Sequence, residues 1–390
     1  MAGGYAALER EYDDAGNVTR EKYFDAEANP TTDQNGYGEV RKEYNENKKT
    51  VYEAWFDAEG NPTPRNSNIY YAIRREFDEA GNTILEKYLD AEGNPTADKN
   101  GYGEIRKEYN ENKKAVYEAW FDPEGNPVHV KGDEYCAVRR EYDEAGNVIL
   151  EKYLDAEGNP TVNKNGYGEI RKEYNEEKQA VYEAWSDAEG NPVPRSGETY
   201  YAVQREYDGA GNVTREKYFD AEGNAATDQA GYGEIRREYN EKKQIIYEAW
   251  YGTDGLPVPI AGDVYFEVRK EYDDNGLVIS ESFFDCYGHP TTCREGYEKV
   301  QREFNEQKKV SLESYFRNDG TPVTNVNGVY RTAFEYDEKG RVIREAYNDA
   351  YGEPMVNKDG CLAIEREYDK NGNKVSETEV FPEEEAAAEP

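Results

Sequence analysis

The sequence from residue 4 to residue 68 reads GYAALEREYDDAGNVTREKYFDAEANPTTDQN and then GYGEVRKEYNENKKTVYEAWFDAEGNPTPRNSN, two lines that align from end to end. Twelve copies of this repeat, each 32 or 33 residues long, fill nearly the whole chain of 390 residues. A period in this range is typical of repeat proteins, in which each repeat packs on its neighbours. The repeats begin near Gly4, Gly36, Ile69, Gly101, Glu134, Gly166, Thr199, Gly231, Val264, Gly296, Gly328 and Gly360.

Each repeat contains two strand-like runs joined by a turn. In the first repeat, residues 5–12 alternate small or apolar side chains with charged ones, and residues 18–25 form a second run. Residues 13–17 read DDAGN, which favours a tight turn with glycine in a left-handed conformation. A second turn follows the second run, as in DAEGNP at residues 90–95, where the proline ends the strand. The pattern predicts a β-hairpin, and no helical periodicity is found in the array.

Odd-numbered and even-numbered repeats differ, so the true period is a pair of repeats. Odd repeats carry glycine in the first turn, whereas even repeats up to the tenth carry sequences such as NENKK at residues 45–49. The four tryptophans occur only in even repeats, 65 residues apart. We expect an all-β protein, an elongated β-solenoid or superhelix of about twelve stacked hairpins with a paired period of 65 residues. We expect a single array over residues 4–381, ending in a cap, and a disordered acidic tail at residues 382–390.

Composition narrows the class of partner. The chain has 48 Lys and Arg against 83 Asp and Glu, a net charge of −35, which disfavours nucleic acids and anionic membranes. No stretch approaches the roughly 20 apolar residues of a membrane span, so no membrane insertion is expected, and no signal peptide precedes the first repeat. Only 36% of residues are hydrophobic, but 36 tyrosines, 12 phenylalanines and 4 tryptophans supply large apolar side chains. These numbers predict a thin aromatic core spread along the array.

Alternation along each strand sorts the side chains onto two faces. Two glutamates recur in all twelve repeats, at the places of Glu11 and Glu21 in the first. Like charges opposite one another destabilise a sheet, so these carboxylates are expected to have partners. Simple alternation places on a core face Leu8, Arg10, Tyr12, Val18, Lys22 and Phe24, and on the other face Tyr5, Glu11, Glu21 and Tyr23.

Two interpretations of this second face follow. In the first, the basic residue at the Arg10 place of one hairpin pairs with glutamates of the next, and tyrosine hydroxyls donate hydrogen bonds to the same carboxylates. This interpretation predicts that Glu141→Gln lowers the stability of the protein. In the second, the rings stack on a sugar and the carboxylates accept hydrogen bonds from its hydroxyl groups. The residues that would bind the sugar are Trp55, Trp120, Trp185, Trp250, Tyr23, Tyr88, Tyr153, Tyr218, Glu43, Glu53, Glu108, Glu118, Glu173, Glu183, Glu238 and Glu248.

Support for catalysis or for a bound cofactor is weak. Carboxylate pairs occur in every repeat and no repeat departs from the others to create one special site, so we expect no enzyme and no cofactor. Turns such as DAEGN resemble part of a calcium loop but lack its alternating ligands and its distal glutamate. Cys286, His289 and Cys293 supply three zinc ligands where a structural site needs four, and the two cysteines either form a disulfide or stay free. No metal site is predicted.

The run REYDEAGN at residues 140–147 resembles the YD repeats of bacterial Rhs and teneurin-type proteins, whose strands coil into large β shells. The resemblance covers the first turn of most odd repeats and of the last one, as at Tyr12-Asp13 and Tyr368-Asp369. The other even repeats have Tyr-Asn or Phe-Asn there and no glycine, and the spacing is longer and more regular. More weakly, the aromatic hairpins with GNP turns are similar to choline- and glucan-binding repeats of Gram-positive surface proteins.

From these observations we predict a non-enzymatic bacterial repeat module, extracellular or at the cell surface and part of a larger protein. It would bind glycan or cell-wall polymer multivalently through the aromatic and carboxylate face. The alternative is a purely structural spacer or shell repeat, and a second alternative is binding of calcium or basic peptides by the acidic surface. The first two differ in whether the rings at the Tyr23 and Trp55 places line an open groove or are buried between hairpins.

Overall fold

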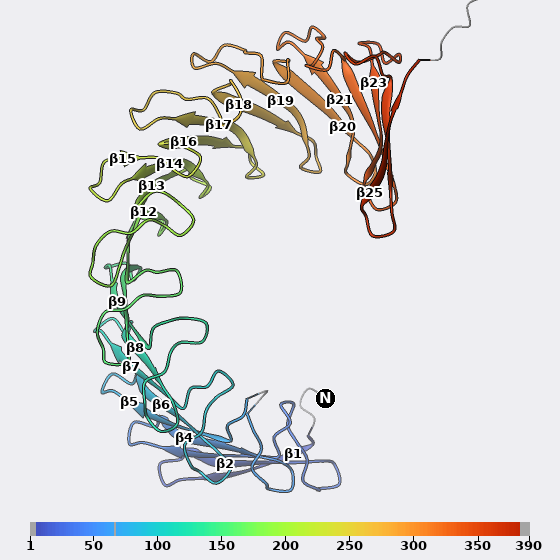
Figure 1. The fold of residues 1–390 in the computed structure, drawn as a ribbon. Coiled ribbons are helices and arrows are strands. Elements are labelled where there is room, and N and C mark those ends of the chain that lie inside the picture. The colour runs from blue at the N-terminus through green and yellow to red at the C-terminus, as the bar shows by residue number, and fades with distance from the viewer. Residues whose placement is uncertain (1–4, 66–67, 383–390) are drawn as a thin grey trace, which may run out of the picture. The chain divides into compact units, whose positions relative to one another are not determined.

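The computed structural model describes residues 5–65 and 68–382, and in these ranges it contains β-strands and no helix (Figure 1). The all-β fold class and the tandem hairpins predicted from the sequence are confirmed. Apart from residue 382, the tail predicted at residues 382–390 lies outside the described residues. The chain divides into two compact units, an N-terminal unit of residues 1–196 and a C-terminal unit of residues 197–390.

The strands follow one another in pairs, and each pair is one repeat. In the N-terminal unit, hairpins 1–6 are formed by β1 (Ala7–Tyr12), β2 (Val18–Phe24), β3 (Glu39–Tyr44), β4 (Thr50–Phe56), β5 (Ala72–Phe77), β6 (Thr83–Leu89), β7 (Glu104–Tyr109), β8 (Ala115–Phe121), β9 (Ala137–Tyr142), β10 (Val148–Leu154), β11 (Glu169–Tyr174) and β12 (Ala180–Ser186). In the C-terminal unit, hairpins 7–12 are formed by β13 (Ala202–Tyr207), β14 (Val213–Phe219), β16 (Glu234–Tyr239), β17 (Ile245–Tyr251), β18 (Glu267–Tyr272), β19 (Val278–Phe284), β20 (Lys299–Phe304), β21 (Val310–Phe316), β22 (Arg331–Tyr336), β23 (Val342–Asn348), β24 (Ala363–Tyr368) and β25 (Lys374–Val380), with the short β15 (Ala225–Ala226) beside β14.

Within each unit the hairpins join edge to edge into an antiparallel sheet. The two strands of a hairpin pair over six positions, as in β1 and β2, where Leu8 lies opposite Tyr23. The second strand then pairs over three positions with the first strand of the next hairpin, as when Glu21 of β2 lies opposite Val40 of β3. Each sheet therefore lengthens by one hairpin per repeat, in chain order (Figure 1).

The first turn has one geometry with two kinds of residue. In hairpin 1, the Asp13 carboxylate accepts hydrogen bonds from two backbone N–H groups of the turn, and Gly16 has a φ of 79°. In hairpin 2, Asn45 takes the place of the aspartate and Lys48 has a φ of 58°. A left-handed conformation costs a residue with a Cβ roughly 1 kcal/mol. The Lys48 ammonium donates to the carbonyl of Ala15 at 3.2 Å, so the lysine ties its turn to the preceding hairpin.

A β-bulge follows the first turn of every hairpin. In hairpin 1, Tyr12 lies opposite Val18 and Glu11 lies opposite Arg20, so Thr19 is an extra residue without an opposite partner. The same shift occurs in the other eleven hairpins. An extra residue reverses the alternation of side chains beyond it.

The bulge overturns the assignment of faces made from simple alternation. One face of the sheet, here called the ring face, carries the Leu8, Arg10, Glu21 and Tyr23 places together. The other, here called the reverse face, carries the Glu11 place. The two recurring glutamates of each repeat therefore lie on opposite faces of the sheet.

The core of the ring face is a row of aromatic side chains. In the N-terminal unit, ring centroids are 4.8 Å apart between Tyr5 and Tyr23, 6.1 Å between Trp55 and Tyr70, and 4.6 Å between Tyr70 and Tyr88. In the C-terminal unit the distances are 6.0 Å from Tyr232 to Trp250, 6.1 Å from Trp250 to Tyr265 and 4.5 Å from Tyr265 to Phe283. Each hairpin buries its rings against those of its neighbours, as the aromatic composition predicts.

A close approach of two backbone segments fixes a glycine in even hairpins. A Cβ built on Gly103 would lie 2.4 Å from the backbone nitrogen of Pro123, in the second turn of the same hairpin. A Cβ built on Gly38, Gly168 or Gly233 would lie 2.4 to 2.7 Å from backbone atoms of the corresponding turn. In hairpin 10 the place is taken by Glu298, whose N–H donates to Phe316 as that of Gly103 donates to Phe121.

We expect Gly103→Ala to lower the free energy of unfolding by about 1–3 kcal/mol, because the new methyl group overlaps backbone atoms that cannot rotate away. Urea denaturation followed by circular dichroism measures the change. Gly209→Ala is the control, because a Cβ there meets nothing within 4 Å and its φ is not positive, and it should change stability by less than about 0.5 kcal/mol. Equal stability of Gly103→Ala and the parent protein would contradict the close approach.

Candidate functional site

The aromatic residues predicted to bind a sugar are mostly buried. Trp55, Trp185 and Trp250 are 3%, 4% and 5% exposed, and Trp120 is partly buried. The four tyrosines at the Tyr23 place, Tyr23, Tyr88, Tyr153 and Tyr218, are all buried. The rings therefore lie between hairpins, which is the outcome that separates the two interpretations of the sequence.

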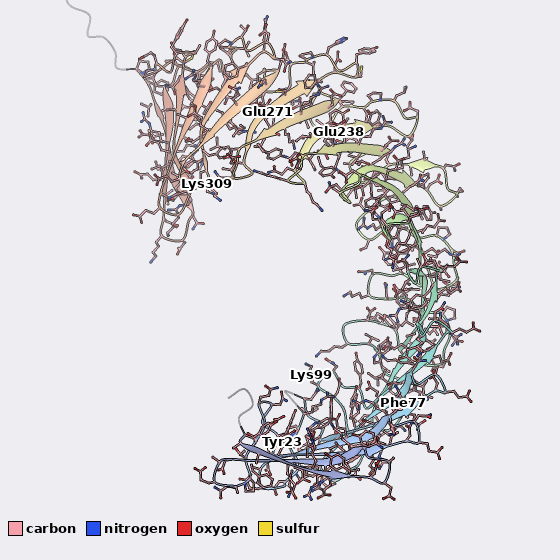
Figure 2. All side chains as sticks on the ribbon, turned by 180° about the vertical axis from the view of Figure 1, so that it is seen from behind. Tyr23, Phe77, Lys99, Glu238, Glu271 and Lys309 are labelled. Atoms are coloured by element: carbon pink, nitrogen blue, oxygen red, sulfur yellow. The ribbon has the colours of Figure 1, made fainter. Side chains whose placement is uncertain are left out.

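The predicted glutamates divide between the two faces. Those at the Glu21 place share the ring face with the tryptophans: Glu53, Glu118, Glu183 and Glu248. Those at the Glu11 place lie on the reverse face: Glu43, Glu108, Glu173 and Glu238. Figure 2 labels Glu238 of this second set on β16, together with Glu271, which stands at the same place on β18. The structure thus brings together the rings and only one of the two recurring carboxylates.

The ring-face glutamates form a ladder with the basic residues at the Arg10 place. In the N-terminal unit, the ammonium of Lys42 lies 3.9 Å from Glu21 of the preceding hairpin and 3.8 Å from Glu53 of its own. Glu53 in turn lies 3.7 Å from Arg75 of the following hairpin. Lys42 and Arg75 therefore each link two hairpins. This is the internal pairing of the first interpretation, except that the cation also pairs within its own hairpin, as Lys107, Lys172 and Lys270 do.

The ladder is tightest in the C-terminal unit. Arg237 donates to Glu216 at 2.9 Å and to Glu248 at 2.8 Å, and Arg302 repeats the arrangement with Glu281 and Glu313 at 2.6 and 2.8 Å. Burial alone would raise the pKa of Glu216, but hydrogen bonds from the two neighbouring arginines bring that pKa below its ordinary value. The carboxylate is ionised because two guanidinium groups compensate its desolvation.

The ladder is interrupted at hairpin 11, where Phe334 stands at the Arg10 place. The carboxylates on either side accept hydrogen bonds from tyrosine hydroxyl groups. Tyr315 donates to Glu313 at 3.3 Å, and Tyr347 donates to Glu345 at 3.2 Å. Tyrosine thus acts as the donor that the sequence interpretation anticipated, beside the missing cation.

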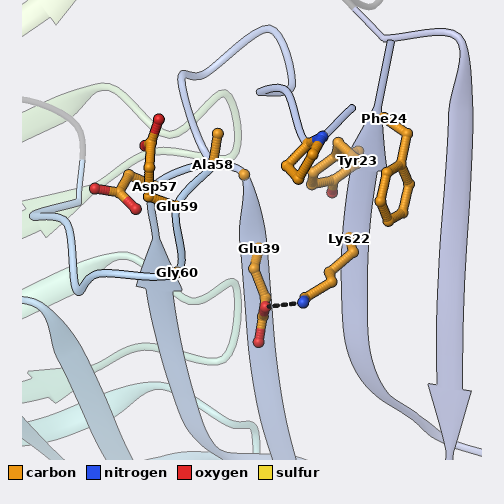
Figure 3. Close-up of a pocket in the computed structure, with 10 residues that line it drawn as sticks. Lys22, Tyr23, Phe24, Glu39, Asp57, Ala58, Glu59 and Gly60 are labelled. Atoms are coloured by element: carbon orange, nitrogen blue, oxygen red, sulfur yellow. Dashed lines mark ion pairs between the residues drawn. The ribbon is translucent and has the colours of Figure 1, made fainter. Parts of the chain in front are cut away.

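A buried glutamate on the reverse face was missed in the sequence. The side chain of Glu39 is 2% exposed and accepts hydrogen bonds from Arg20 at 2.7 and 3.0 Å and from Arg41. It also forms an ion pair with Lys22 at 3.3 Å (Figure 3). Burial would raise the pKa of Glu39, but the hydrogen bonds from the two arginines lower it to about 2. The same place holds Glu104, Glu169 and Glu234. Its signal is the motif GYGEVR at residues 36–41, which recurs with Ile for Val in the fourth, sixth and eighth repeats.

The surface beside Glu39 is a pocket lined by Lys22, Phe24, Pro30 and the second turn of hairpin 2 (Figure 3). An equivalent pocket in hairpins 7 and 8 surrounds Glu234. The buried carboxylate at each pocket is already paired, Glu39 with Arg20 and Lys22 and Glu234 with Arg215 and Lys217.

No three His, Cys, Asp or Glu side chains among residues 5–65 and 68–382 are placed to hold a metal ion. The cysteines are free thiols, Cys286 exposed and Cys293 buried, and His289 lies 3.5 Å from Asp285 in its own turn. Within the same residues, no helix has the length and apolarity needed to cross a membrane.

Comparison with known proteins gives structural matches only. No protein-family model and no curated protein matches the chain. A crystal structure of TcdB2-TccC3-TEV matches with a TM-score of 0.36 and 13% identity, over 97% of this chain and 16% of that chain. A Photorhabdus luminescens Tc holotoxin pore matches with a TM-score of 0.32 and 12% identity, over 95% of this chain and 18% of that chain. A crystal structure of TcdB2-TccC3 matches with a TM-score of 0.26 and 14% identity, over 92% of this chain and 20% of that chain. The chain spans a fifth or less of these proteins.

Within hairpin 5, we expect Glu151→Gln to cost about 1 kcal/mol of stability, because Glu151 accepts a hydrogen bond from Arg140 at 2.9 Å on the ring face. Glu141→Gln in the same hairpin should be nearly neutral, because Glu141 is exposed on the reverse face. Urea unfolding of both variants measures the difference. The sequence interpretation assigned the structural role to Glu141. A larger loss of stability in Glu141→Gln than in Glu151→Gln would therefore support that interpretation and contradict the assignment of faces made here.

Acid should weaken the array through Glu39. Its pKa of about 2 in the folded protein lies below the ordinary value of 4.5, so its contribution to stability is complete above about pH 4.5 and disappears as the pH falls toward 2. Glu39→Gln should therefore lower stability at pH 7 and flatten the loss of stability between pH 4.5 and 2. Unfolding free energies measured across this range provide the test, and parallel pH profiles for the two proteins would refute it.

Proposed function

We propose that this chain is a structural repeat module, a non-enzymatic spacer or scaffold whose repeated side chains hold hairpins together. The proposal rests on one observation: the rings and ring-face carboxylates find their partners inside the array. Trp55 lies between Tyr37 and Tyr70, with centroids 6.2 and 6.1 Å away, and Glu53 lies between Lys42 and Arg75.

Burial removes the main argument for multivalent glycan binding. A sugar that stacked on Trp55 would have to displace a neighbouring ring or the guanidinium of Arg65, which lies 4.9 Å from the centre of the indole. The carboxylates proposed as hydrogen-bond acceptors either pair with arginine and lysine on the ring face or lie on the opposite face from the rings. The structural alternative therefore becomes the leading interpretation.

Repetition supports the absence of catalysis in this proposal. A catalytic site needs one desolvated set of groups that differs from its surroundings. Here the desolvated carboxylates recur from hairpin to hairpin with arginine partners, as Glu216 and Glu281 do. We also propose, from the YD-like turns, that the parent protein is bacterial and that the module lies outside the cell or at its surface.

Trp55→Ala should lower the unfolding free energy by about 3–5 kcal/mol, because it removes a ring that is 3% exposed from the middle of the aromatic row. Tyr287→Ala, at a ring that is 81% exposed, is the control and should leave stability unchanged. Cell-wall fragments and soluble glucans should not shift the melting temperature of the parent protein. A Trp55→Ala protein of normal stability that had lost affinity for one of these glycans would sink the proposal.

A further inference from the structure

The buried glutamates of the reverse face differ in how many cations surround them. Glu39 and Glu234 each pair with three basic side chains, whereas Glu104 and Glu169 each pair with two. The third cation is an arginine at the Arg20 place, which hairpins 1 and 7 carry and which hairpins 3 and 5 replace by leucine. This arginine competes with the lysine that all four carboxylates have beside them.

The arginine takes the carboxylate and displaces the lysine. Arg20 donates from Nε and Nη2 to the two oxygens of Glu39 at 2.7 and 3.0 Å, and hairpin 7 repeats both bonds at 2.7 and 2.9 Å. The ammonium of Lys22 then lies 3.3 Å from Glu39, and that of Lys217 lies 3.5 Å from its glutamate. In hairpins 3 and 5, which lack the arginine, the lysine lies at 2.7 and 2.8 Å. A planar guanidinium matches both carboxylate oxygens better than an ammonium does.

The pKa values of the glutamates follow the same division. Burial raises the pKa of Glu39, and hydrogen bonds from Arg20 and Arg41 lower it to about 2. Burial also raises the pKa of Glu169, and there the hydrogen bonds that lower it come from Lys152 and Arg171. Lysine is therefore a principal partner of the carboxylate at Glu169, whereas arginines take that part at Glu39.

Each displaced lysine lines a pocket. The pocket at Lys22 has a volume of about 370 Å³ and the pocket at Lys217 about 310 Å³, the size of a small-molecule site (Figure 3). Phe24 lines the first and Phe219 the second, so each pocket also has an aromatic wall. An occupant would meet an ammonium group and an apolar surface together.

A carboxylate lines each pocket from the second turn of the following hairpin. Glu59 supplies it in the first pocket and Asp254 in the second, and both residues are exposed. Asp57 also lines the first pocket, but it accepts hydrogen bonds from Asn61 and its counterpart in the second pocket is Gly252. Both pockets thus present one cation and one anion, which fits a zwitterion. A zwitterion has no net charge, so the net charge of −35 does not repel it.

We propose that each of these two pockets binds an α-amino acid with an apolar side chain. In the first pocket the α-carboxylate pairs with Lys22, the α-ammonium faces Glu59 and the side chain packs on Phe24. Arg20 is a positioning residue, because it holds Glu39 and so leaves the lysine to the ligand.

The first test is a calorimetric titration of the full chain with phenylalanine, which should bind as two molecules per chain. Phenylpropionate lacks the ammonium group and phenethylamine lacks the carboxylate, and each should bind at least about tenfold more weakly because one charge-assisted contact is lost. Lys22→Met with Lys217→Met should weaken phenylalanine binding to the same extent. No binding of phenylalanine by the parent chain, equal binding of the three compounds, or unchanged affinity in the lysine variant would each overturn the proposal.

The second test examines the arginine in a Lys217→Met chain, which keeps only the first pocket. Arg20→Leu recreates hairpin 3, so Lys22 should close on Glu39 and phenylalanine binding should weaken at least about tenfold. Adding Glu39→Gln removes the charge that captures the lysine and should restore binding, which a purely structural role of Arg20 would not produce.

Arg344→Leu is the matched control, because it removes arginine at the same place in hairpin 11, where Ala363 stands in place of the buried glutamate, and it should leave affinity unchanged. Loss of binding in this control, or no restoration by Glu39→Gln in a chain that circular dichroism shows to be folded, would refute the part assigned to Arg20. The three compounds need no variant and decide the proposal if the substituted chains unfold. None of these results would bear on the spacer function.

Discussion

One extra residue after the first turn is the constraint on which the structure depends. Without it, the Glu21 place would fall on the face opposite the Arg10 place, and the basic and acidic residues of each hairpin would be separated by the sheet. With it, arginine, glutamate and the aromatic rings share one face. The rings exclude water from the carboxylates, and the guanidinium groups compensate the desolvation that the rings impose.

The acidity of the chain is largely a consequence of its turns and ladders. Aspartate or asparagine opens turn after turn, and the side chain of Asp13 accepts backbone N–H groups just as that of Asp25 does. Hydrogen bonds from Asn17 lower the pKa of Asp13, so the turn stabilises the charged form. A carboxylate in this protein is therefore a backbone-binding group or half of an ion pair more often than a free charge, except at the Glu11 place of hairpins such as 3 and 5.

Local features were predictable from the sequence and the register was not. The runs expected at residues 5–12 and 18–25 are β1 (Ala7–Tyr12) and β2 (Val18–Phe24), because alternation and turn residues act within a few positions. The bulge at Thr19 could not be predicted from the sequence, because the same residues are compatible with either register. The register nevertheless decides which side chains of the two strands lie opposite one another. Burial of the tryptophans depends on the neighbouring hairpin. Glu39 was not predicted, because its motif is not shared by all twelve repeats and occurs only in the second, fourth, sixth and eighth.

Phe334 gives the array a preferred point of opening. Coupling between repeats is limited to nearest neighbours, so an array separates first where one joint is weaker than the others. At hairpin 11 the cation that links successive hairpins is missing, and two tyrosine hydroxyls hold the flanking carboxylates in its place. We therefore expect hairpins 11 and 12 to separate from hairpin 10 before hairpin 10 separates from hairpin 9, because Arg302 joins those two through Glu281 and Glu313. Under tension, or under a protease, the joint at Phe334 should open before the joint that Arg302 closes.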